Sequence, residues 1–200
     1  MKKTALLFLI IGFTVGTFAQ TKSPLTFDRL IGMERVSDPQ LSPDGKTAAF
    51  VVTTHDPVNN AVNSNIHLVS LESGAVRPLT SVPKANNSPR WTPDGKTLFF
   101  VSTRDGESQI WKIPAAGGEA TKVSTISTEA SGLVLSADGK LAAFASDVFP
   151  DCPTDDCNKK RNEEMAASKV KARIITRLPY RIWNYWKDGK RSHAFIMSAD

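Results

Sequence analysis

The sequence lacks a hydrophobic run long enough to cross a membrane. Its longest apolar run, residues 5–19, has 15 residues. At about 1.5 Å per residue, a helix of that length falls short of the roughly 30 Å core of a bilayer. The composition is 40% hydrophobic and 22% charged. It excludes a disordered chain, a collagen-like chain and a polytopic membrane protein.

This apolar run has the features of a secretory signal peptide. Two lysines precede it, and the small residues Thr17 and Ala19 stand before Gln20. A positive start, a short apolar core and small residues at positions −3 and −1 are typical of bacterial export signals. We therefore predict a signal peptide over residues 1–19 and a periplasmic or secreted mature chain that starts at Gln20. No cysteine lies near the cleavage point, which argues against a lipoprotein.

Cysteine and histidine are scarce. Cys152 and Cys157 are the two cysteines, in a C-x4-C spacing, and the nearest histidine is His193. A structural zinc ion takes four ligands, so this pair lacks two of them. In an oxidising compartment the spacing predicts a disulfide that closes a small loop, with free thiols and a metal site as alternatives. We expect no metal and no organic cofactor.

The positive net charge of the chain is local. Residues 20–150 hold 12 basic and 13 acidic residues, whereas residues 151–200 hold 11 basic and 7 acidic residues. Proteins that bind nucleic acid usually present a basic patch or stripe. The balanced body of the chain therefore predicts no nucleic-acid partner, and signal cleavage predicts no membrane partner.

A short motif occurs three times. It reads SPDGK at residues 42–46, TPDGK at 92–96 and SADGK at 136–140, with spacings of 50 and 44 residues. Ser or Thr can bond the turn backbone, Pro presets its own φ, and Gly accepts a positive φ, so each motif predicts a tight turn. A period of 40–50 residues is typical of repeat proteins.

Short strands flank each predicted turn. The runs after the turns, at 47–52, 97–102 and 141–146, are apolar, and we expect them to be buried on both faces. Further strands are expected at residues 66–71 and 76–79 in the first repeat and at 110–114 and 120–123 in the second. Four strands per repeat predict a β-propeller blade in an all-β fold. An antiparallel sandwich is the alternative, which the recurrence of the turn at the same place in each unit disfavours.

We divide the mature chain into a leader, residues 20–37, and a partial propeller, residues 38–200. The blades are expected at about 38–82, 86–125 and 129–200, the third with an insertion over 149–192. Residues 193–200 align with 110–116, so a fourth strand of the third blade would follow them. Three incomplete blades leave strand edges unpaired. We therefore expect the chain to be the N-terminal piece of a longer protein.

Four segments carry a family signature. They are LTFDRL at 25–30, RVSDPQLSPDGK at 35–46, TRDG with QIW within 103–111, and RLPYR with GKRSH within 177–193. They resemble the leader, the first two blades and the third-blade insertion of the prolyl oligopeptidase family of serine peptidases, in its dipeptidyl peptidase 5 and acylaminoacyl-peptidase branch. The resemblance covers residues 25–200. The repeat motif by itself is shared with TolB-type propellers, which are not enzymes.

The resemblance implies that an α/β-hydrolase domain with a Ser–His–Asp triad follows the propeller. In that fold the serine lies in a G-x-S-x-G turn. The nearest match, residues 12–16, has Thr14 at its centre and lies in the predicted signal peptide. We therefore expect no catalytic residue in this chain. The triad is expected downstream, in the C-terminal domain of the same protein, which would be a partner of the propeller.

The predicted insertion is partly helical. Residues 158–171 are rich in helix formers, and Asn158 or Asp156 is expected to cap the helix start. An apolar face is expected on this helix, formed by Ala166, Val170 and Ile174. We expect this charged helix either to cover a blade edge or to project toward the expected catalytic domain and shape its cleft. An aromatic and basic cluster follows, expected to pack on the next blade or on the hydrolase domain: Arg181, Trp183, Tyr185, Trp186 and Arg191.

Two adjacent glutamates, Glu163 and Glu164, are the candidate substrate-binding residues. Adjacent glutamates on a propeller insertion resemble the pair with which dipeptidyl peptidase IV holds the free N-terminus of its substrate, since carboxylates bind an ammonium group by charge-assisted hydrogen bonds. Consecutive helix residues point about 100° apart, which weighs against their convergence on one group.

Two functions fit these patterns. The first is the propeller portion of an exported serine exopeptidase that releases dipeptides or similar short units from oligopeptide N-termini. The propeller would then admit short chains and exclude folded proteins. The second is a non-enzymatic, TolB-like periplasmic propeller that binds proteins. A G-x-S-x-G motif further along the reading frame would decide for the first.

Overall fold

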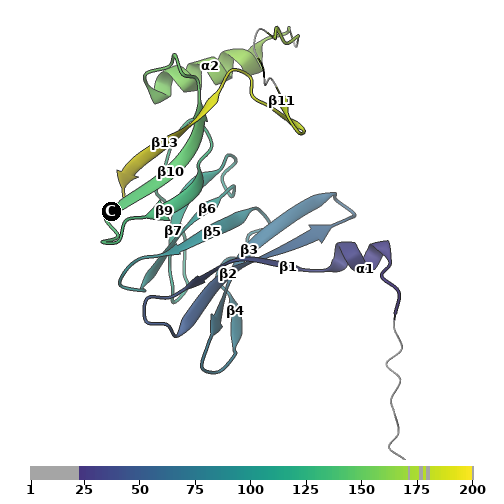
Figure 1. Cartoon of the computed structure of the whole chain (residues 1–200), viewed down its shortest axis with the longest axis vertical. Helices are drawn as coiled ribbons and strands as arrows, with labels where there is room; N and C mark the ends of the chain where they lie inside the picture. Colours follow the sequence, from purple (N-terminus) through teal and green to yellow (C-terminus); the bar gives the residue numbers. More distant parts are fainter. Residues whose placement is uncertain (1–22, 171, 176–177, 179–180, 200) are drawn as a thin grey trace, which may run out of the picture.

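Antiparallel sheets follow one another along the chain, with a helical insertion in the third (Figure 1). The structure is a computed structural model that describes residues 23–170, 172–175, 178 and 181–199. The predicted signal peptide, residues 1–19, lies outside the described residues. Neither helix in the described part of the chain has the length and apolar composition that a membrane span requires.

The first two sheets each contain four strands that pair in chain order. The first consists of β1 (Arg35–Leu41), β2 (Thr47–Asp56), β3 (Ala61–Ser70) and β4 (Val76–Pro78). The second consists of β5 (Asn86–Trp91), β6 (Thr97–Ser102), β7 (Gln109–Pro114) and β8 (Thr121–Lys122). Such four-stranded meanders are propeller blades. The predicted all-β propeller fold is therefore confirmed.

The third sheet has the order β13-β10-β9 and contains the insertion. Its strands are β9 (Ser131–Leu135), β10 (Leu141–Val148) and β13 (Arg191–Ser198). Between β10 and β13 lie α2 (Asp155–Ala167) and a hairpin of β11 (Arg181–Ile182) and β12 (Tyr185–Trp186). A short helix, α1 (Phe27–Gly32), precedes the first sheet. Because β1 begins at Arg35, the first strand starts inside the segment predicted as the leader, residues 20–37.

Each repeated turn is held by its own side chains. In the second turn the Thr92 hydroxyl donates to Asp94 Oδ1 (2.6 Å) and accepts from the backbone N–H of Thr97 (3.1 Å). The backbone N–H of Lys96 also donates to Asp94 Oδ1 (3.0 Å). The same bonds recur in the turns at 42–47 and 136–141. The hydroxyl bond and then the N–H bond hold the pKa of the Asp94 carboxyl below its usual range.

The first strand of every sheet contains a β-bulge four residues before the turn. The ladder shifts register there, and the residue at that place has a positive φ: Asp38 (47°), Ser88 (54°) and Gly132 (61°). A bulge bends its strand and redirects a side chain. At Asp38 the redirected carboxylate accepts from Arg90 NH1 of the next sheet at 2.9 Å. The bulge thus connects the first strands of neighbouring sheets.

The second sheet lies between the other two, so β6 is buried on both faces. Leu98 and Phe100 pack in a cluster with the first sheet, and Phe99 and Val101 pack in a cluster with the third. Full burial of such a side chain stabilises the fold by about 1.5–3 kcal/mol. The runs at 47–52 and 141–146 were also expected to be buried on both faces, and within the described residues each has a neighbouring sheet on one face. Buried and less buried residues alternate along β10 and at the start of β2, because each outer sheet packs one face on the middle one.

The third sheet repeats the register of the second. The backbone N–H of Ala199 donates to Lys140 O (2.9 Å), as that of Ala115 donates to Lys96 O (2.8 Å). Ala199 therefore corresponds to Ala115, and His193 corresponds to Gln109. The predicted alignment of His193 with residue 110 is wrong by one residue, a shift that would exchange the two faces of the strand.

Candidate functional site

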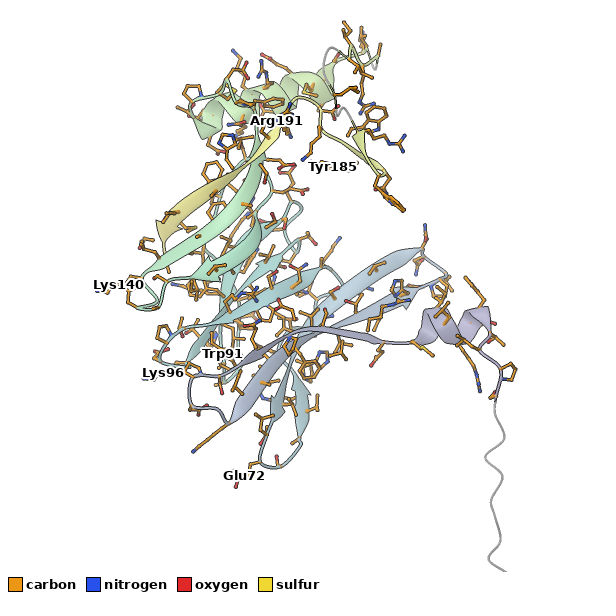
Figure 2. All side chains as sticks on the ribbon, viewed as in Figure 1. Glu72, Trp91, Lys96, Lys140, Tyr185 and Arg191 are labelled. Carbon is orange, nitrogen blue, oxygen red and sulfur yellow. A yellow bond between two sulfur atoms is a disulfide. The ribbon has the colours of Figure 1, made fainter. Side chains whose placement is uncertain are left out.

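The two ends of the sheets carry different groups (Figure 2). Lys96, Lys140 and Glu72, from turns, lie at one end, and Tyr185 and Arg191, from the insertion, lie at the other. The insertion joins the second and third strands of its sheet, and the corresponding connections of the first two sheets are short. The candidate site is therefore the insertion end.

The insertion helix begins earlier than predicted. Thr154 caps α2, and its hydroxyl accepts from the backbone N–H of Cys157 at 3.3 Å. Asp156, one of the two predicted caps, lies in the first turn, where a carboxylate interacts favourably with the helix dipole. Asn158, the other, lies inside the helix and is 4% exposed. Its Oδ1 accepts from the backbone N–H of Phe149 (2.9 Å), which holds the helix against the end of β10.

Further contacts fix the start of α2. The Asp155 carboxylate accepts from the hydroxyl (2.7 Å) and the backbone N–H (3.0 Å) of Ser127. Cys152 and Cys157 form a disulfide, with their Cα atoms 5.3 Å apart. These contacts tie the helix to the loop between the second and third sheets and close the loop before it.

The expected apolar helix face does not form. The helix ends at Ala167, with Ser168 as its C-cap. Val170 and Ile174 lie beyond it and are 73% and 91% exposed. The sequence of α2, DDCNKKRNEEMAA, is polar almost throughout, so polar contacts at its first turns hold it instead of an apolar stripe.

The two candidate glutamates lie on the exposed side of α2. Glu164 is within 4.0 Å of Lys160 and lines a hollow of ≈ 550 Å³ together with Asp151, Asp188 and Met165, among others. Glu163 is exposed and is not among the residues that line this hollow. Arg161 bonds the Asp151 carboxylate at the same place and lowers its pKa.

The predicted aromatic and basic cluster separates into distinct contacts. The Trp186 ring lies under two guanidinium groups, Arg173 at 4.4 Å and Arg181 at 5.2 Å. The Tyr185 hydroxyl donates to Asp147 Oδ2 (3.0 Å). Burial and then this bond raise the pKa of Tyr185. Sequence reasoning missed Asp147, because only the fold brings β10 to this hairpin.

Trp183 differs from its neighbours in the hairpin. It is the first of the two turn residues between β11 and β12, has a φ of 53° and is 91% exposed.

Arg191 lies at the start of β13, opposite Val148, and its NH1 donates to Lys190 O at 2.9 Å.

The three histidines lie on strands and in separate places. His55 contacts Arg35 NH1 (2.8 Å), His67 stacks on Phe50 (5.8 Å between centroids), and His193 pairs with Ser146 across β10 and β13. No group of His, Cys, Asp and Glu side chains among the described residues is arranged to hold a metal ion.

Comparison with known proteins identifies the family. Residues 30–162 match the model of the TolB beta propeller domain. The chain belongs to this family. It is also similar to propellers of the dipeptidyl peptidase 5 and acylaminoacyl-peptidase branch, as the sequence predicted.

Individual relatives give the extent of this similarity. The chain is 31% identical to dipeptidyl-peptidase 5 of Porphyromonas gingivalis over 192 residues, covering 92% of this chain and 27% of that protein. It is 36% identical to the peptidase YuxL of Bacillus subtilis over 120 residues, covering 60% of this chain and 18% of that protein.

A solved structure shows the same fold. The acylaminoacyl peptidase of Pyrococcus horikoshii matches with a TM-score of 0.63 and 17% identity, covering 86% of this chain and 24% of that chain. The chain thus spans about a quarter or less of the length of these relatives.

Proposed function

We propose that the chain is the N-terminal propeller portion of an exported serine exopeptidase. The enzyme would release dipeptides or similar short units from the N-termini of oligopeptides. One observation carries the proposal: the similarity to dipeptidyl-peptidase 5 covers 92% of the chain and so takes in most of the insertion, beyond the end of the TolB model at residue 162.

In this function the propeller would control which substrates reach the catalytic site and would help to bind them. The chemical step belongs to the α/β-hydrolase domain expected downstream, where a serine, activated by histidine, attacks the scissile carbonyl. The propeller would cover that site, so that short peptides enter and folded proteins do not. The insertion would contribute a wall of the cavity, since ligand sites commonly lie between domains.

The test of the proposal is an assay of the protein expressed from its complete reading frame. We expect hydrolysis of dipeptidyl or acylaminoacyl p-nitroanilides and loss of that activity after treatment with a serine-directed fluorophosphonate. The separately expressed residues 20–200 are the control and should be inactive, because we expect no catalytic residue in them. Absence of both hydrolysis and fluorophosphonate labelling in the complete protein would overturn the proposal.

Glu163 and Glu164 remain the proposed ligands of the substrate's free N-terminus. Glu164 is the better candidate of the two because it lines the hollow and Glu163 does not. Glu164→Ala should raise the KM for peptides with a free amine and leave that for N-acetylated peptides unchanged. An unchanged KM for free-amine peptides in both Glu163→Ala and Glu164→Ala removes this role.

Export is the second part of the proposal. Cleavage before Gln20 would release the mature chain into the periplasm or the medium. N-terminal sequencing of the protein from the periplasmic fraction should give Gln20 as the first residue. A cytoplasmic protein that retains Met1 would contradict it.

A second function stays open because the family model itself is that of the TolB propeller. A TolB-like periplasmic binding module needs no catalytic domain. A complete reading frame that adds only further Asp-Gly-Lys repeats would favour this function, and protein partners would then be sought.

A further inference from the structure

A buried hydroxyl fastens the end of each of the first two sheets. Thr80 and Ser124 each lie two residues after the fourth strand of their sheet and are 5% exposed. The Thr80 hydroxyl accepts from the backbone N–H of Ile66 in β3 at 2.9 Å. The Ser124 hydroxyl accepts from the backbone N–H of Ile110 in β7 at 2.8 Å. In both sheets the backbone N–H of the hydroxyl residue also donates to the carbonyl of that isoleucine, at 3.2 Å.

A side-chain amide completes this contact. The residue before the isoleucine is Asn65 in the first sheet and Gln109 in the second. The Asn65 amide bonds the Thr80 hydroxyl at 2.9 Å. Gln109 Oε1 accepts from the Ser124 hydroxyl (2.7 Å), and its Nε2 donates to Ile126 O (2.7 Å) in the connection to the third sheet. The amide therefore links the third strand of a sheet to the connection that leads to the next sheet.

The third sheet has a histidine at the place of this amide. In the register of β13, His193 corresponds to Gln109 and Ala194 to Ile110. A neutral imidazole has one nitrogen that accepts a hydrogen bond and one N–H that donates. His193 can therefore make both bonds that Gln109 makes.

The described residues leave the outer side of β13 unpaired. In that part of the chain β10 is the one strand that pairs with it (Figure 1). Ile66 and Ile110 are fully buried, whereas His193 and Ala194 at the same register are exposed. An unpaired strand edge is a template for another strand. A hydroxyl is the side-chain group that can accept from the Ala194 N–H and at the same time donate to an imidazole.

We propose that a fourth strand, from the segment that follows Asp200 in the complete reading frame, pairs with β13 and is followed by a serine or threonine that binds His193. The hydroxyl accepts from the Ala194 N–H and donates to the imidazole. The other ring nitrogen donates to a carbonyl of the connection to the next sheet. Because β13 begins at Arg191, directly after the insertion, this contact anchors the end of the insertion. The inference does not rest on the proposed function, since a peptidase propeller and a TolB-like module share the blade.

The test measures amide hydrogen exchange in the protein from the complete reading frame. Mass spectrometry follows a peptide that contains Ala194, and we expect that peptide to be protected. His193→Ala should accelerate its exchange about 10-fold, the effect of one lost hydrogen bond. His193→Gln restores the side chain of the second sheet and should keep the protection. Ser192→Ala, at the neighbouring exposed residue, is the matched control and should leave the exchange unchanged.

Two further variants relate the third sheet to the second. Gln109→Ala should accelerate exchange of a peptide that contains Ile110 to a similar extent, which gives the reference effect in the same protein. The complete sequence identifies the serine or threonine after the fourth strand. Its replacement by alanine should add little to the effect of His193→Ala, because the two residues are partners in one bond.

Four results would overturn the inference. An unprotected Ala194 in the complete protein means that no strand covers β13. Protection that depends on protein concentration means that a second copy covers it, and protection that appears only with an added octapeptide means that a peptide does. Unchanged exchange in His193→Ala means that the strand pairs without the histidine. None of these results uses peptidase activity, so the inference and the proposed function fail separately.

Discussion

At the scale of single residues, the glycines of the repeated turns differ in their surroundings. Gly45 and Gly139 have nearly the same φ, 71° and 73°. A Cβ atom at Gly45 would have no neighbour within 4 Å, whereas one at Gly139 would lie 2.5 Å from Cδ of Pro93 in the previous turn. Successive turns therefore pack on each other, and the glycine at 139 serves that packing as well as the turn.

This difference predicts unequal costs for the same substitution. Gly45→Ala should lower the free energy of unfolding by about 1–2 kcal/mol, because alanine disfavours a positive φ. Gly139→Ala should cost about 1–3 kcal/mol more, because it also displaces Pro93. Urea unfolding of the propeller measures both. In a Pro93→Ala background the excess at Gly139 should disappear, and equal losses at both sites would refute the packing argument.

The turn aspartates predict a dependence of stability on pH. The folded state lowers the pKa of Asp94 through the Thr92 hydroxyl and the Lys96 N–H. A carboxyl with a depressed folded pKa stabilises the fold above its unfolded pKa of about 3.9, and this contribution is lost as the pH falls through the folded value. Asp94→Asn should therefore be less stable than the original protein at pH 7, with a gap that narrows near pH 3. A gap of the same size at both pH values would contradict this assignment.

At the scale of elements, the start of α2 depends on one buried amide. Asn158 Oδ1 accepts from the Phe149 N–H, and its Nδ2 donates to Thr154 O (3.0 Å). Asn158→Ala leaves the buried Phe149 N–H without this acceptor and should cost about 1–3 kcal/mol. Hydrogen exchange at Phe149 and along α2 should accelerate. Lys159→Ala, a change at the next and exposed residue, is the control and should leave exchange unchanged.

The elements also show what the sequence could predict. The three turns and the strands after them were predictable, because Pro, Asp and Gly act locally and the apolar runs are short. The bulges at Asp38 and Ser88 were not, since neither residue is glycine. Sequence reasoning missed Thr154 as the N-cap of α2, because Asp156 and Asn158 are also residue types that favour the N-cap position. Which one caps depends on Asn158 turning toward Phe149, a contact set by tertiary packing.

The candidate site was predictable in place but not in detail. The insertion was recognised from its charge, its cysteines and its interruption of the repeat. Two adjacent carboxylates suggested a binding site for an ammonium group, yet Glu164 lines the hollow and Glu163 does not. Trp186 contacts the guanidinium groups of Arg173 and Arg181. Trp183 lies in the turn with a positive φ and is exposed. Residue spacing alone does not reveal this difference between the two tryptophans.

At the scale of the whole molecule, the two ends of the sheets carry different structural features. The tight turns at one end are a structural repeat shared with TolB propellers. The other end carries an insertion held by polar contacts, a disulfide and a fixed hairpin, and it is there that the chain differs from a plain propeller. We propose that this end faces the peptide substrates of an exported exopeptidase.

The most direct test of the proposed exopeptidase function is product analysis with the protein from its complete reading frame. It is incubated with an unstructured octapeptide that has a free N-terminus, with its N-acetylated form and with a folded protein, and the products are identified by mass spectrometry. We expect successive release of dipeptides or similar short units from the octapeptide and no cleavage of the folded protein. Cleavage at internal sites of the folded protein, or no cleavage of any peptide, would contradict it.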